Sequence, residues 1–110
     1  MGQNQLTTFG ERIRTLREEV ELPLRKVAAD LNIDPSLLGK IERNERLPTK
    51  EFIQQIAKYY KINPKMLSNE FLSDQIAYKI LDEEADIEIL KVAEEKVEYL
   101  KTAKKKANAK

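Results

Sequence analysis

The side chains that can do chemistry in this chain are almost all carboxylates, lysines and arginines. There are 19 Asp and Glu and 20 Lys and Arg but no His and no Cys, which removes the commonest transition-metal ligands and the usual general base near neutral pH. The carboxylates fall in surface-like runs, and the sequence has no glycine-rich phosphate loop. We therefore expect a protein that is not an enzyme and that holds neither a metal nor another cofactor.

The charges are distributed unevenly along the chain, although the net charge is only +1. Residues 1–68 carry 12 bases and 9 acids, residues 69–101 carry 4 bases and 10 acids, and four further lysines follow. A basic N-terminal part joined to an acidic segment is typical of a nucleic-acid-binding domain with an appendage that does not bind.

The sequence contains no sign of a membrane or secretion segment. No apolar run approaches the ~20 residues needed to span a bilayer, and the N-terminus lacks the basic start and apolar middle of a signal peptide. The absence of Cys rules out disulfides, which suits a reducing compartment. We expect a cytoplasmic protein with no membrane partner.

Hydrophobic periodicity predicts helices and no strand, so the expected fold class is all-α. Helices are predicted over 8–19, 23–31, 35–43, 50–60, 64–67 and 73–81, and a long final helix begins at about residue 86. Thr8 and Glu11 have the spacing of a capping box. Four helix starts carry a residue that can cap exposed backbone N–H groups: Thr8, Asp34, Thr49 and Asn63.

Two of these helices form the most informative pattern in the chain, between Val27 and Pro48. Asp34-Pro35 separates them and provides an N-cap carboxylate followed by proline at the first helical position. Small and apolar residues stand where two crossing helices must touch: Val27, Ala28, Leu31, Ile33, Leu38 and Ile41. This pattern predicts a helix-turn-helix, a motif that places its second helix in a DNA groove.

The sequence resembles the lambda-repressor-like family, the Cro/repressor-type or xenobiotic-response-element helix-turn-helix proteins. The resemblance covers residues 9 to about 67 and lies in the stretches FGERIRTLREEVEL, PLRKVAADLNI, DPSLLGKIERNERLPT and FIQQIAKYYKINPKML. It implies a five-helix lambda-repressor-like DNA-binding domain, at residues 8–68, whose third helix reads the major groove.

The resemblance also implies roles for individual residues. Those expected to address bases are Pro35, Ser36, Leu37, Gly39 and Lys40, with Leu37 equally able to pack inward. Those expected near phosphates are Arg25, Lys26, Arg43, Asn44, Arg46 and Lys50. An ion pair between Arg17 and Glu42 is expected to hold the first and third helices together.

Three positions depart from the family pattern. Leu24 stands where a DNA-binding glutamine is common, and Gly39 replaces a side chain that could read a base edge. Asn44 stands where glycine is usual, and it can adopt the left-handed conformation expected at the end of a helix. These departures affect the choice of bases more than the fold.

The remaining residues, 69–107, are predicted to form a C-terminal helical extension that serves as a dimerisation element. The long final helix carries an apolar stripe with spacings of three, four and three residues: Leu90, Ala93, Val97 and Leu100. The alternative is that this helix folds back on the DNA-binding domain of its own chain.

The sequence thus predicts sequence-specific binding of double-stranded DNA by a homodimeric transcriptional regulator, a repressor, of a bacterium or phage. The expected operator is palindromic, because two-fold dimers place two reading helices one DNA turn apart. Three alternatives remain open: an antitoxin whose last helix binds a toxin, a restriction-modification controller, and an interaction adaptor that does not read bases.

Overall fold

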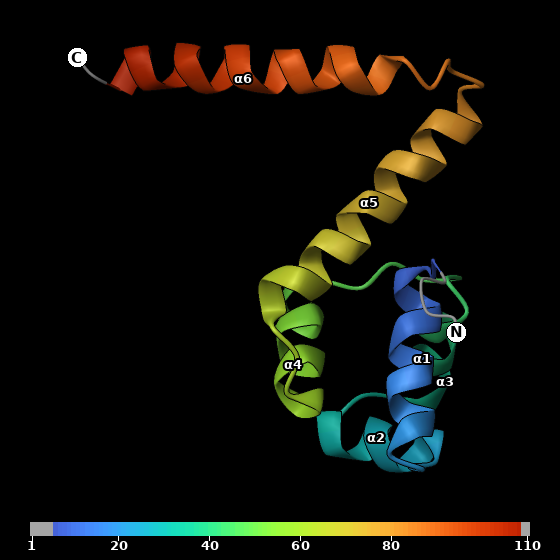
Figure 1. Cartoon of the computed structure of the whole chain (residues 1–110). Coiled ribbons are helices and arrows are strands. Elements are labelled where there is room, and N and C mark those ends of the chain that lie inside the picture. Colours follow the sequence, from blue (N-terminus) through green and yellow to red (C-terminus); the bar gives the residue numbers. More distant parts are fainter. Residues whose placement is uncertain (1–5, 109–110) are drawn as a thin grey trace. The chain divides into compact units, whose positions relative to one another are not determined.

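The computed structural model describes residues 6–108, and that part of the chain is helical without a strand (Figure 1). The expected all-α fold class is confirmed. The helices are α1 Phe9–Glu19, α2 Leu24–Leu31, α3 Pro35–Glu42, α4 Lys50–Tyr60, α5 Pro64–Asp82 and α6 Ile89–Asn108. Within residues 6–108, no helix is long and apolar enough to cross a membrane.

The chain divides into two compact units between Gln75 and Ile76. We call the first the head unit and the second the C-terminal unit. The division falls inside α5, seven residues beyond the domain limit expected from the sequence.

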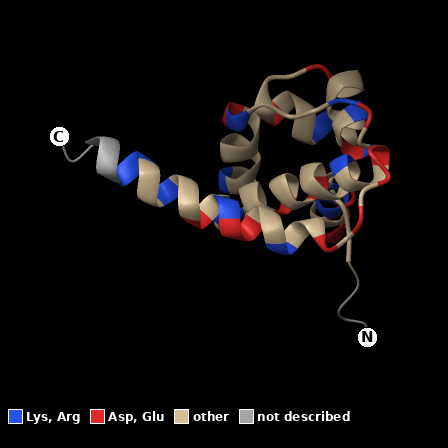
Figure 2. Ribbon diagram, turned by 90° about the horizontal axis from the view of Figure 1, so that it is seen from above, with Lys and Arg blue, Asp and Glu red and all other residues tan. Residues whose placement is uncertain are grey.

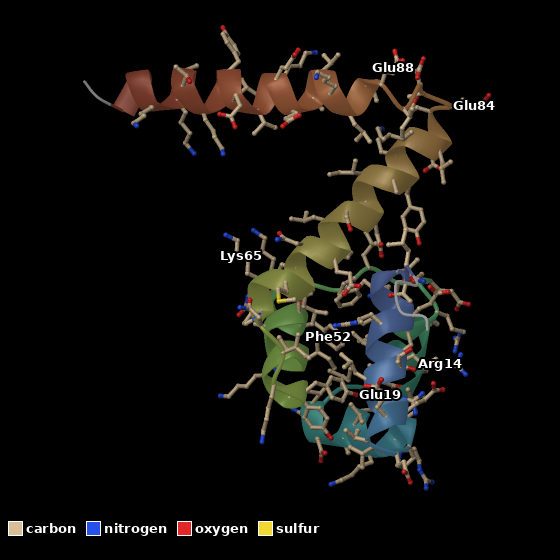
Figure 3. The ribbon with its side chains drawn as sticks, in the orientation of Figure 1. Arg14, Glu19, Phe52, Lys65, Glu84 and Glu88 are labelled. Carbon is tan, nitrogen blue, oxygen red and sulfur yellow. The ribbon has the colours of Figure 1, made fainter. Side chains whose placement is uncertain are left out.

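The head unit is built around one apolar core to which all five of its helices contribute. Phe52 points into this interior, whereas Arg14 projects from the outer face of α1 (Figure 3). The predicted core positions Leu38 and Ile41 are buried, at 0% and 3% exposure. The buried apolar side chains are Phe9, Ile13, Val27, Ala28, Leu31, Leu38, Ile41, Phe52, Ile53, Ile56, Ala57 and Leu67.

The predicted caps define the helix starts. The Thr8 hydroxyl accepts from the Glu11 N–H at 3.3 Å while Glu11 Oε1 accepts from the Thr8 N–H at 3.0 Å, which completes the capping box. Asp34 and Thr49 accept backbone N–H groups at 2.8 and 3.0 Å. The bond that Asp34 accepts from the Ser36 backbone also lowers the pKa of its carboxyl group.

The separate short helices predicted at 64–67 and 73–81 are wrong, because α5 is continuous from Pro64 to Asp82. Ser73, the expected start of the second helix, does not act as a cap. Its hydroxyl donates to the Glu70 carbonyl oxygen at 2.8 Å, as serines inside helices do. No Pro or Gly stands between Ser68 and Ser73 to end the helix.

The middle of α5 is retained in the head unit by contacts with the start of α1. The Phe9 N–H donates to Asp74 Oδ2 at 2.7 Å, and the Phe9 and Phe71 rings pack edge to face with centroids 5.7 Å apart. Arg12 Nε lies 3.6 Å from Glu70 Oε1. These contacts explain why the compact unit extends to Gln75 rather than ending near Ser68.

The final helix also differs from its prediction at its start. It begins at Ile89, about one turn later than expected, after a turn in which Asp86 Oδ1 accepts the Glu88 N–H at 3.1 Å. Before it, α5 ends at Asp82 in a compact turn: Glu84 is left-handed, with φ of 51°, and the Ala85 N–H donates to the Ile80 carbonyl at 3.0 Å.

Two adjacent tyrosines of α4 have pKa values above the ordinary value. The Tyr59 hydroxyl donates to Asp30 Oδ2 at 2.6 Å, which raises the pKa of Tyr59 to about 12, and burial raises the pKa of Tyr60 to about 12. Both values exceed the usual ~10, so the folded state favours the neutral hydroxyl of each tyrosine. The stabilisation from these two hydroxyls is complete below pH 10 and is lost as the pH rises toward 12.

We therefore expect the free energy of unfolding to fall between pH 10 and pH 12, and to fall less steeply in Tyr60→Phe. Urea denaturation across this pH range measures the difference. Tyr99→Phe is the control, because Tyr99 lies in the C-terminal unit and is 71% exposed. Identical pH profiles for wild type and Tyr60→Phe would contradict the assignment.

Candidate DNA-binding surface

The helix α3 is held from one side and open on the other. It packs against α1 and α2, with Leu38 fully buried. The turn before it is compact, because Asn32 adopts a left-handed conformation with φ of 60° and the Ile33 N–H donates to the Ala28 carbonyl at 2.9 Å. The α2–turn–α3 arrangement therefore presents the remaining face of α3 to solvent.

Three of the five expected base-reading residues lie on this open face. Pro35, Ser36 and Lys40 are exposed, and Ser36 and Lys40 stand four residues apart, about one helical turn. Leu37 is partly buried and packs against the core, which favours the alternative of inward packing. Ser36 offers a hydrogen-bond donor and acceptor, and Lys40 offers a cation suited to guanine acceptors.

Gly39 is buried rather than open to a base edge. A Cβ at this position would lie 3.2 Å from Arg43 Nη1 and 3.5 Å from Leu24 Cδ2. The missing side chain therefore lets the Arg43 guanidinium and the Leu24 side chain approach α3 closely. Leu24, which stands at the usual glutamine position, is partly buried and packs against the core of the head unit.

Gly39→Ala is expected to stabilise the head unit by about 0.5–1 kcal/mol, because alanine is the better residue inside a helix. The new methyl group makes an ordinary contact with Leu24 and displaces only the end of an exposed arginine. Urea denaturation at neutral pH measures this gain. A loss of stability would indicate that the Arg43 side chain is held rigidly over α3.

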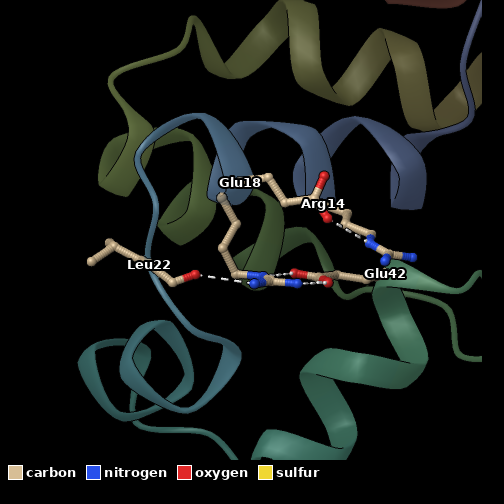
Figure 4. Close-up of polar contacts among 5 residues, drawn as sticks. Arg14, Glu18, Leu22 and Glu42 are labelled. Carbon is tan, nitrogen blue, oxygen red and sulfur yellow. Dashed lines mark hydrogen bonds and ion pairs between the residues drawn. The ribbon is translucent and has the colours of Figure 1, made fainter.

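The C-terminal end of α3 is tied to α1 by a bidentate ion pair. Arg17 Nε and Nη2 donate to the two carboxylate oxygens of Glu42 at 2.8 and 2.9 Å, and Arg17 Nη1 donates to the Leu22 carbonyl at 3.0 Å (Figure 4). The two side chains are 14% and 5% exposed. Glu42 raises the pKa of Arg17, and the pair occupies the positions expected from the sequence.

These features describe a helix-turn-helix whose second helix is exposed along one face. The family model that matches the chain is that of a helix-turn-helix domain, and it covers residues 10–70, more than half of the sequence. The chain belongs to the helix-turn-helix domain family. No curated protein matches it.

The match makes this a DNA-binding helix-turn-helix protein of the Cro/repressor type, and such proteins act in transcription regulation. The family is typically non-enzymatic. The matched residues run from the first turn of α1 into α5, so they contain α2, α3 and the whole candidate surface.

The cations expected near phosphates belong to several elements of this helix-turn-helix protein. All of them are exposed: Arg25 and Lys26 in α2, Arg43 at the end of α3, Arg46 in the following loop and Lys50 at the start of α4. Figure 2 shows that acidic residues are interleaved with the basic ones over the head unit. The surface is therefore a mixed one, in which particular cations rather than a uniform field must hold DNA.

Two of these cations already have acidic partners. Lys26 Nζ lies 3.1 Å from Asp30 Oδ1, and Arg43 donates two hydrogen bonds to Glu45 at 3.1 and 3.2 Å. The Arg43–Glu45 pair raises the pKa of Arg43 and lowers that of Glu45. Among residues 6–105, no ion pair involves Arg25, Arg46 or Lys50, which leaves those cations available to other anions.

Asn44 has a structural contact that the sequence did not reveal. It adopts the expected left-handed conformation, with φ of 62°, and its side chain reaches α1. Asn44 Oδ1 accepts the Gly10 N–H at 3.1 Å, and Asn44 Nδ2 donates to Thr8 Oγ1 at 2.8 Å. The amide expected near a phosphate thus also joins the end of α3 to the start of α1.

Gly10 is the residue of this region that sequence reasoning missed. A Cβ there would lie 2.6 Å from the carbonyl oxygens of Ile41 and Glu42, so only glycine permits this approach of α1 to the end of α3. The available signal was a glycine in the first turn of a predicted helix, where other residues are better helix formers.

Proposed function

We propose that this helix-turn-helix protein is a homodimeric transcriptional repressor that binds a palindromic operator with α3 in the major groove. The observation that carries the proposal is the exposed face of α3, on which Ser36 and Lys40 stand one turn apart while Leu38 anchors the opposite face. A helix held in this way can enter the groove without losing its core contacts.

Ser36 and Lys40 are assigned to base edges. Pro35, the first residue of α3, is assigned a position close to the bases in the major groove. Arg25, Arg46 and Lys50, which form no ion pair within residues 6–105, are assigned to phosphates. Lys26 and Arg43 join them, and the phosphate replaces Glu45 as the partner of Arg43. Phosphate contacts supply affinity and register, and base contacts supply the choice of sequence.

A single head unit contacts only a few base pairs, so selective binding requires two copies. Two-fold dimers place their reading helices about 34 Å apart, one DNA turn, and bind inverted half-sites. The apolar stripe of α6 supports assembly, because its large side chains are 42–59% exposed: Leu90, Val97 and Leu100. An operator that overlaps a promoter would then be blocked by the bound dimer, which is the basis for assigning repression.

Selection of bound sequences from a random DNA pool with the full-length protein tests this function. We expect enrichment of an inverted repeat with half-sites about one helical turn apart. Enrichment of no sequence would favour an adaptor that does not read bases. A reporter with the selected operator over its promoter then decides the sign: lower expression with the protein supports repression, and higher expression contradicts it.

Lys40→Ala and Arg46→Ala should separate base reading from phosphate binding. Lys40→Ala is expected to change the preferred base and to cost about 1–3 kcal/mol on the selected operator. Arg46→Ala is expected to lower the affinity for all DNA sequences alike. The slope of log affinity against log salt concentration should decrease by about the amount due to one phosphate contact. Fluorescence anisotropy at several salt concentrations measures both effects.

Lys58→Ala is the matched control, because it removes an exposed cation from the last turn of α4. It should leave both the base preference and the salt slope unchanged. If Lys40→Ala and Arg46→Ala gave the same pattern, the division between base and phosphate roles would be wrong.

A further inference from the structure

The helix α6 carries an apolar stripe with the spacing of a short coiled coil. Its four members occupy successive a and d positions of two heptads, and all four are exposed: Leu90, Ala93, Val97 and Leu100. Burial of such a stripe requires a partner surface of the same length. The charges at the two ends of α6 indicate which partner surface fits the stripe.

We propose that α6 pairs with α6 of a second copy of this chain in antiparallel orientation. Leu90 of each copy then faces Leu100 of the other, and Ala93 faces Val97. The two-fold axis crosses the helices at the level of Glu95, so the interface is isologous and closes on itself. This inference rests on the proposed homodimer and specifies the partner surface and its direction.

The charges at the two ends of α6 favour this direction. Residues 82–88, just before the helix, contain five acids and no base, whereas the last turns contain Lys101, Lys104 and Lys105 and no acid. Antiparallel pairing brings the acidic end of one copy to the basic end of the other. Parallel pairing would bring like charges together at both ends, and the aligned helix dipoles would add to the repulsion.

The heptad position that follows the stripe gives the same answer. The next a position after Leu100 is Lys104, whereas Asp86 lies in the turn before α6 and has no heptad position. In the antiparallel register, Lys104 of one copy lies near the acidic segment 82–88 that precedes α6 in the other. In the parallel register, Lys104 would face Lys104 of the other copy within the seam.

The sizes of the central side chains also fit an antiparallel pair. Each small Ala93 then lies opposite a larger Val97, so the two central layers have equal volume. A parallel pair would place the two alanines opposite each other and leave a gap beside a wider valine layer. Because interiors are packed densely and gaps are costly, the antiparallel arrangement packs more evenly.

Cysteine cross-linking of the full chain tests the direction, and the sequence has no native Cys to interfere. Leu90→Cys protein is mixed with affinity-tagged Leu100→Cys protein and oxidised mildly. We expect disulfides between the two variants, because the two positions face each other. Cysteines of the same variant would be offset by 10 residues, about 15 Å along the helix, beyond the ~7 Å Cα limit of a disulfide.

The other outcomes of this experiment overturn the proposal. Disulfides that join two copies of the same variant, without disulfides between Leu90→Cys and Leu100→Cys proteins, would show a parallel pair. Protein that forms no intermolecular disulfide and sediments as a single chain of 12.8 kDa would show that α6 folds back on its own chain or binds another protein.

A charge in the stripe provides an independent measurement. Val97→Glu should raise the dimer dissociation constant by at least about tenfold in sedimentation equilibrium. Tyr99→Glu, on the same helix but outside the stripe and 71% exposed, should leave it unchanged. Equal effects of the two variants, or no effect of either, would overturn the assignment of the stripe.

Failure of this inference can be distinguished from failure of the proposed function. A Val97→Glu protein that still binds a half-site in the anisotropy assay shows that the head unit reads DNA whatever α6 does. Conversely, an intact antiparallel dimer that enriches no DNA sequence would overturn the proposed function and leave the inference standing.

Discussion

Gly10→Ala is expected to destabilise the head unit by roughly 3 kcal/mol. The added Cβ would lie 2.6 Å from the carbonyl oxygens of Ile41 and Glu42 and 2.5 Å from Asn44 Oδ1. Two of these three atoms belong to the backbone at the end of α3, so the helix itself must move away from α1. That movement also weakens the bond from the Gly10 N–H to Asn44.

Urea denaturation followed by helical circular dichroism measures this loss. Gly39→Ala is the matched control, because it makes the same change inside another helix but meets only flexible side chains. A Gly10→Ala protein within about 0.5 kcal/mol of wild type would contradict the tight approach of the two helices.

Glu42→Gln is expected to cost about 3 kcal/mol or more, because it leaves a largely buried arginine without its counter-charge. The Arg17 side chain is only 14% exposed, and its guanidinium also holds the Leu22 carbonyl before α2. Loss of the carboxylate therefore loosens the position of α3 relative to both α1 and α2. DNA affinity should fall with stability, because the reading helix is no longer held in one orientation.

The comparison with Glu18→Gln separates burial from charge. That substitution removes the carboxylate of an ion pair with Arg14 whose side chains are 58% and 56% exposed, so the expected loss is below about 0.5 kcal/mol. Replacing Arg17 and Glu42 together with methionine and leucine should recover much of the lost stability. Equal losses for Glu42→Gln and Glu18→Gln would show that burial of the Arg17–Glu42 pair is unimportant.

The compact head unit extends past residue 68, where the sequence predicts the end of the DNA-binding domain. A domain ending at Ser68 would lack Phe71, which packs on Phe9, and Asp74, which accepts the Phe9 N–H. The change in composition near residue 68 was a change in surface charge and did not mark the end of the core. The compact unit ends at Gln75, one residue after Asp74.

The candidate surface was only partly predictable, for a similar reason. The exposed positions of Ser36 and Lys40 follow from the period of α3, because Leu38 and Ile41 must face inward. The burial of Gly39 does not follow from that period. It depends on Leu24, which belongs to another helix, and on the Arg43 side chain lying back over α3.

The sequence by itself determined the first four helices, most of the helix caps and the helix-turn-helix, because these depend on interactions within a few residues. Thr8 with Glu11 and Asp34 with Ser36 are local hydrogen bonds that a short stretch of sequence reveals. Only the tertiary structure decided how closely the helices meet and which side chains join them. The bonds of Gly10 to Asn44 and of Phe9 to Asp74 join residues 34 and 65 positions apart, and no local pattern records them.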